Sequence, residues 1–165
     1  MSLLVDLKNF PKDEGLFYEG ELPPSVFELD SKDIIQPESP LTYRIQVFKN
    51  EEDLILTGYL EARFSLQCGR CGERFFMDQL LNNYGQSIPI ENDQSIDLTS
   101  YLREDMLLSL PNYPRCETGN VNPRDCPAQG RFESDLDFQQ DDESTEAGGS
   151  NTWEALDKLN NLKSN

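Results

Sequence analysis

Two neighbouring segments alternate apolar and polar residues so regularly that they restrict the fold to one built on a sheet. In residues 41–47 the apolar positions are Tyr43, Ile45 and Val47. In residues 54–67 they include Leu60, Ala62, Phe64 and Leu66. Because successive side chains of a strand point to opposite faces, this period of two predicts strands that are buried on one side. The polar residues 50–53 between them predict a hairpin turn.

A pair of cysteines follows the second of these strands without a break, in the sequence Cys68-Gly69-Arg70-Cys71-Gly72. A β-prone run, residues 74–77, leads away from the pair. The sequence therefore predicts a Cys-x-x-Cys turn held at one end of an antiparallel sheet.

The clearest helical pattern begins at Asp97, which is a good N-cap residue, and stops at Pro111. Its apolar residues recur at helical spacing: Leu98, Tyr101, Leu102, Met106 and Leu110. We expect a helix over about 97–110 that packs on the sheet. The predicted fold class is α+β, with an antiparallel sheet core, one packed helix and a loop-rich cysteine region.

The predicted domain covers residues 1–131. Its first 40 residues are expected to be loop-rich, because proline and glycine recur there and disfavour long regular structure. Within them, residues 3–7 predict an edge strand and residues 25–29 a short element. Residues 88–90 predict another short strand, and Pro89 would confine it to an edge.

The C-terminal part differs in composition. Residues 132–150 are acidic and then rich in Gly and Ser, which predicts a disordered linker. Residues 151–165 predict a short terminal helix that either folds back on the domain or binds a partner. In the second interpretation the partner-binding residues are Trp153, Leu156 and Leu159.

Charge and composition limit the function. The chain has a net charge of −17 and no histidine, which removes the commonest general base and favours a non-catalytic protein. Residues 63–131 are nearly neutral, however, and all seven of their basic residues are arginines. Four lie within three residues of a cysteine and are candidates for contact with RNA or a protein partner: Arg70, Arg74, Arg115 and Arg124. The alternative is that they pair with acidic neighbours such as Glu73, Glu117 and Asp125.

The four cysteines are candidate metal ligands. No apolar run is long enough to cross a bilayer and the first residues do not resemble a signal peptide, so we expect a cytoplasmic protein without disulfides. Cys68 and Cys71 have the spacing of half a zinc site, which Cys116 and Cys126 could complete. The nine residues between the last two are atypical of such sites, so a turn without a ligand stays open. A redox dithiol is disfavoured, since it would begin a helix.

The order of these features resembles the YceD-like family, known as large ribosomal RNA subunit accumulation proteins. The resemblance spans residues 40–162. It is carried by Cys68-x-x-Cys71, by Ile96-Asp97-Leu98 leading through Glu104 and Asp105 to Leu107-Leu108-Ser109-Leu110-Pro111, and by residues 153–159, Trp-Glu-Ala-Leu-Asp-Lys-Leu.

The resemblance implies a non-catalytic factor that supports accumulation of large-subunit ribosomal RNA during ribosome assembly. Its partner would be ribosomal RNA or a ribosomal protein of the large subunit. The chain departs from the family in its second cysteine pair, because many relatives have a close Cys-x-x-Cys after the helix. An alternative function is that of an acidic adapter that escorts a basic ribosomal protein without contacting RNA.

Overall fold

The computed structural model describes residues 2–11, 14–90 and 94–130. The predicted linker 132–150 and terminal helix 151–165, with Trp153, Leu156 and Leu159, lie outside these residues. In chain order the elements are β1 (Leu4–Asp6), β2 (Leu16–Leu22), η1 (Pro24–Phe27), β3 (Ile35–Pro37), β4 (Leu41–Lys49), β5 (Asp53–Gln67), β6 (Arg74–Pro89), β7 (Ser95–Asp97), α1 (Thr99–Leu108) and η2 (Cys116–Thr118). None of the helices in these ranges is long and apolar enough to cross a membrane.

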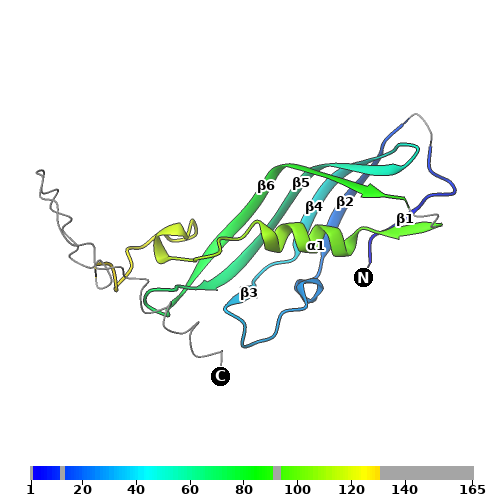
Figure 1. Ribbon diagram of the computed structural model, residues 1–165. Helices are drawn as coiled ribbons and strands as arrows, with labels where there is room; N and C mark the ends of the chain where they lie inside the picture. The colour runs from blue at the N-terminus through cyan, green and yellow to red at the C-terminus, as the bar shows by residue number, and fades with distance from the viewer. Residues whose placement is uncertain (1, 12–13, 91–93, 131–165) are drawn as a thin grey trace, which may run out of the picture. The chain divides into compact units, whose positions relative to one another are not determined.

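A five-stranded antiparallel sheet forms the core of the fold (Figure 1). The hairpin of β5 and β6 pairs along the whole length of β5, from Asp53 to Gln67. The other edge of β5 pairs first with β4 and then, from Phe64 to Leu66, with β3. β2 pairs with the outer side of β4. The predicted α+β fold with one packed helix is confirmed.

The inner face of this sheet carries the hydrophobic core. The alternating residues of β4 and β5 are buried as predicted, and Ile45, Val47, Leu60 and Phe64 are fully inaccessible to solvent. α1 lies against β5 and buries Leu98, Leu102 and Met106 completely. The helix is shorter than predicted and its N-cap residue is Leu98 instead of the predicted Asp97, which ends β7; the Asp97 carboxylate accepts a hydrogen bond from the Thr99 amide at 2.9 Å.

A second, two-stranded sheet joins the N-terminal segment to the segment that precedes α1. β1 pairs with β7, and Val5 lies opposite Ile96. Both residues are buried. The expected edge strand in residues 3–7 is therefore present, although its partner directly precedes α1 rather than belonging to the main sheet.

Two sequence predictions were wrong. Residues 16–22 form a full strand, β2, because the prolines of this region lie outside it, Gly20 is accommodated opposite Tyr43, and its even positions still face the core. Residues 88–90 do not begin a separate strand, since Ile88 and Pro89 end β6. β6 also runs far beyond residue 77, because it pairs with the whole of β5; its register shifts opposite Gly58 and Leu60, and this shift interrupts the alternation that would have marked its length.

Gly58 permits this irregular pairing. A Cβ atom at this position would lie only 2.1 Å from the backbone oxygen of Arg44. The backbones of β4 and β5 thus approach too closely here for any side chain.

Candidate metal centre

The four cysteines come from two separate segments that meet at one end of the β5–β6 hairpin. Cys68 directly follows β5, and Cys71 lies in the turn before β6. Cys116 begins η2, and Cys126 lies ten residues further along the same loop. In Figure 1 this loop, in yellow-green and yellow, follows α1 toward the end of the hairpin.

The sulfur atoms form a compact group in which all four Sγ atoms lie within 4.8 Å of one another. Cys68 Sγ is 3.8 Å from Cys126 Sγ, and Cys71 Sγ is 3.6 Å from Cys116 Sγ. No disulfide joins them. Four thiolates at the usual zinc–sulfur distance of about 2.3 Å, arranged as a tetrahedron, would be about 3.8 Å apart. The spacing therefore fits a single metal ion bound by four sulfurs.

Backbone hydrogen bonds fix the turn that carries the first two cysteines. The Cys68 amide donates to the Glu73 carbonyl, and the Gly72 amide donates to the Cys68 carbonyl, both at 2.9 Å. Gly72 has a φ of 76°, in the left-handed region that favours glycine. The Gly69 amide donates to the Pro114 carbonyl at 2.9 Å and so ties the turn to the second segment.

Cys68, Cys116 and Cys126 are buried and Cys71 is partly buried, and the thiols influence one another's ionisation. Burial by itself would raise the pKa of Cys68, but backbone hydrogen bonds from Cys71, Arg70 and Cys116 outweigh it and lower that pKa to about 6. The Arg70 amide lies 3.4 Å from this sulfur. Burial, followed by hydrogen bonds with Cys71 and Cys68, raises the pKa of Cys116 to about 12. One thiolate thus forms readily, and a cation at the centre would favour ionisation of the others.

The segment between Cys116 and Cys126 also covers part of the free edge of β6. The Asn120 side chain accepts from the Asp78 amide at 2.7 Å and donates to the Asp78 carbonyl at 2.8 Å. Val121 forms an isolated bridge with Phe76, and Arg124 donates to the Arg74 carbonyl at 3.2 Å. A metal at the four cysteines would fasten both ends of the segment that covers this edge.

The four arginines predicted to contact RNA or a partner do surround the cysteine cluster, but several have partners within the domain. Arg70 pairs with Glu117 at 2.9 Å, and Arg124 pairs with Glu73 at 2.6 Å. The Arg74 guanidinium donates to the Asp33 carbonyl at 2.9 Å. Arg115 has no ion pair within the described residues. The alternative of local pairing is thus realised for Arg70 and Arg124.

The arrangement is suited to holding a metal ion rather than to catalysis at one. A site closed by four protein ligands leaves no position for water or substrate, which is typical of structural metal sites. The cysteine pair follows a strand, so no helix N-terminus activates a thiol for redox chemistry.

Comparisons with protein-family models, with curated proteins and with solved structures find no match to this chain. The chemistry of the centre follows from its four thiols and their surroundings. The sequence does not predict the role of Asn120. Its partner Asp78 on β6 is 42 residues away, so no local sequence pattern marks the contact.

Proposed function

We propose that Cys68, Cys71, Cys116 and Cys126 bind one zinc ion that stabilises the fold. The observation that carries this proposal is the compact grouping of the four sulfurs, all within 4.8 Å of one another, with two of the separations at 3.6 and 3.8 Å. Four thiolates form a soft ligand set that suits zinc or iron and disfavours calcium and magnesium. We assign zinc because it has no redox chemistry, so the site requires no electron donor or acceptor.

The zinc would connect two parts of the chain that are distant in sequence. It would join the turn between β5 and β6 to the loop after α1. Because ligands distant in sequence meet only in the folded chain, the binding free energy of the metal would add to the stability of this end of the domain.

The metal prediction is tested by measuring zinc and iron in protein purified without chelators. We expect one zinc per chain in the wild type and less than about a tenth of that in Cys116→Ser, since loss of one ligand breaks a four-ligand site. Ser109→Ala, outside the cluster, is the control and should retain one zinc. Equimolar iron with a coloured thiolate spectrum would show that the site binds iron instead of zinc. The absence of any bound metal would contradict the proposed metal site.

We further propose that the stabilised domain is a non-catalytic factor in the accumulation of large-subunit ribosomal RNA. Support comes from the resemblance of the Cys68-x-x-Cys71 turn, the helix ending at Leu110-Pro111 and residues 153–159 to the YceD-like family. The partner would be ribosomal RNA or a ribosomal protein. The arginines around the centre, of which Arg115 is exposed, are the candidates for RNA contact.

This biological role is tested by depleting the protein in its source cells and measuring the ratio of large- to small-subunit ribosomal RNA. The ratio should fall, and wild-type protein should restore it. Restoration by Arg70→Glu/Arg74→Glu, together with failure of purified protein to retard large-subunit RNA at low salt, would favour the escort function without RNA contact. An unchanged ratio after depletion would reject both versions.

A further inference from the structure

The outer face of the five-stranded sheet is largely exposed within the described residues, apart from the buried Ser65 of β5. α1 packs on the inner face only, through its buried residues. Register places five exposed large apolar side chains on the outer face: Phe17, Phe48, Ile55, Phe76 and Leu80. Apolar side chains that gather on one face of a small protein commonly mark a binding surface.

These apolar residues lie in two groups. Phe48 and Ile55 are direct partners across β4 and β5, and Phe17 lies opposite Gln46, two residues before Phe48. In the other group, Phe76 and Leu80 lie on either side of Asp78 along β6. Phe17 and Leu80 are 63% and 43% exposed.

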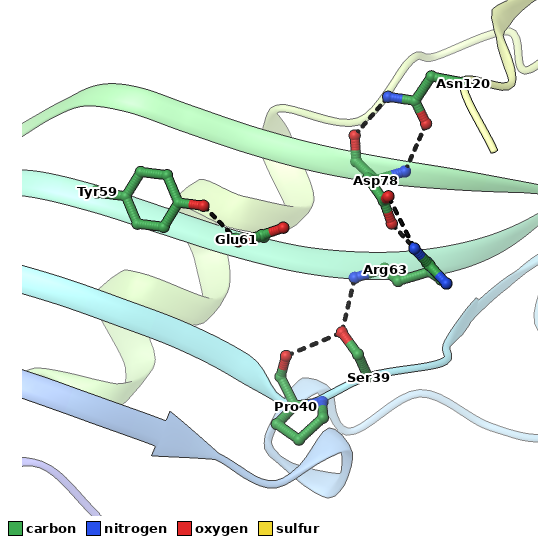
Figure 2. A network of polar contacts seen from close by, with 7 residues as sticks. All are labelled: Ser39, Pro40, Tyr59, Glu61, Arg63, Asp78 and Asn120. Atoms are coloured by element: carbon green, nitrogen blue, oxygen red, sulfur yellow. Dashed lines mark hydrogen bonds and ion pairs between the residues drawn. The ribbon is translucent and has the colours of Figure 1, made fainter.

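An acidic hollow adjoins the second group, because Asp78, between Phe76 and Leu80, is one of its lining residues. Its lining includes Glu21, Glu38, Glu61 and Asp78, with Arg63 as the only basic residue. Figure 2 shows how part of this lining is held in place: Arg63 binds the Asp78 carboxylate at 2.5 and 2.9 Å, and Tyr59 donates to Glu61. The Arg63 amide also donates to Ser39 at 2.8 Å.

Glu21 and Glu38 make no ion pair within the described part of the chain. Across the sheet, register aligns Glu21, Thr42, Glu61 and Leu80 in one row. An acceptor-rich hollow beside apolar side chains complements a lysine or arginine that is flanked by apolar residues. It repels phosphate, as does the net charge of −17.

We propose that this outer face binds a lysine- and arginine-rich segment of a protein partner that also carries apolar side chains. The two apolar groups would contact the apolar residues of the segment, and Glu21 and Glu38 would pair with its basic residues. The inference rests on the proposed function and sharpens it, because it assigns this face to a basic protein instead of RNA.

Binding is measured by fluorescence anisotropy on the full chain with two labelled probes. One is a 16-residue peptide of alternating lysine and leucine, and the other is a single-stranded RNA of similar length. We expect the peptide to bind and its affinity to fall as salt is raised. RNA binding that displaces the peptide, or no peptide binding at low salt, would overturn the proposal.

Surface variants locate the binding. We expect two double variants, Phe17→Ser/Leu80→Ser and Glu21→Gln/Glu38→Gln, each to lower the affinity for the peptide by about tenfold. The reason is that a few central residues usually contribute most of the binding energy of a surface. The controls are Leu108→Ser, an exposed apolar residue on α1, and Glu104→Gln on the same helix. An equal loss of peptide affinity in the controls would show that binding depends only on net charge or on nonspecific apolar contact. It would contradict binding at the outer face.

A photo-reactive side chain at position 17 identifies what touches the face. Cross-links to the peptide support the proposal, whereas cross-links to residues 132–165 or to a second copy without peptide would overturn it. Zinc content is measured on the same samples. Peptide binding lost while zinc is retained contradicts only this inference, and absent zinc contradicts only the metal centre.

Discussion

The two ends of the β5–β6 hairpin are stabilised by different means. Near the turn between β4 and β5, the sheet is covered by an apolar core in which Leu54, Leu56 and Ile88 are almost or fully inaccessible to solvent. At the opposite end the loop 112–130 contributes little apolar surface, and its buried residues are mainly Cys116, Cys126 and Ala128.

This difference indicates which end of the domain the proposed metal stabilises. A region too small to bury much apolar surface commonly depends on a metal or on disulfides for its stability. The apolar end should therefore stay folded without metal, whereas the cysteine end should not. Four substitutions test whether the two ends are stabilised independently, and they are given in order of decreasing expected effect.

Cys116→Ser should have the largest effect, confined to the cysteine end. Loss of a metal ligand belongs to the few changes that cost more than about 4 kcal/mol. Amide hydrogen exchange should therefore accelerate strongly in residues 112–130 and at Asp78, while α1 keeps its protection. Chelator treatment of the wild type should reproduce the pattern. Uniform acceleration across both ends would show that they are not independent.

Leu102→Ala should destabilise the apolar end by about 2–5 kcal/mol, because it leaves a cavity between α1 and β5. Urea unfolding followed by circular dichroism measures this change. Leu108→Ala, on the exposed side of the same helix, should change stability by less than about 0.5 kcal/mol. The Leu102→Ala variant should retain one zinc per chain. Loss of zinc from this variant would show that the two ends are not stabilised independently.

Asn120→Ala should cost about 1–2 kcal/mol of local stability, since it removes both hydrogen bonds to the backbone of Asp78. Hydrogen exchange at the Asp78 amide is the measurement, and Asn112→Ala in the same loop is the matched control. Unchanged exchange in Asn120→Ala would mean that the segment between Cys116 and Cys126 does not protect the β6 edge.

Arg70→Ala should have the smallest effect, below about 1 kcal/mol, because its ion pair with Glu117 is partly exposed to solvent. Thermal unfolding at low and high salt measures it. A larger loss that salt does not reduce would assign Arg70 a structural role at the metal centre.

The sequence predicted the parts of the fold that local patterns determine. Alternation identified β4 and β5, and helical spacing identified α1 to within two residues at each end. It missed β2, because the nearby prolines and glycines concealed a short alternating run. The length of β6 was also missed, because the register shift opposite Gly58 breaks the period of two.

The candidate site was predictable only in part for the same physical reason. The local spacing of Cys68 and Cys71 marked half of it, whereas Cys116 and Cys126 are brought together by the packing of a loop on the sheet. The hydrogen bonds of Asn120 with β6 and the row of residues across the outer face depend on strand register. Hydrophobic pattern and turn geometry set the register of a regular hairpin, but the shift between β5 and β6 at Gly58 and Leu60 appears only when the two strands are paired.

X-ray absorption at the zinc edge on the purified full chain tests the central claim most directly. We expect four sulfur neighbours at about 2.3 Å and no nitrogen or oxygen neighbour. A first shell that contains oxygen or nitrogen, or fewer than four sulfurs, would contradict a closed site formed by Cys68, Cys71, Cys116 and Cys126.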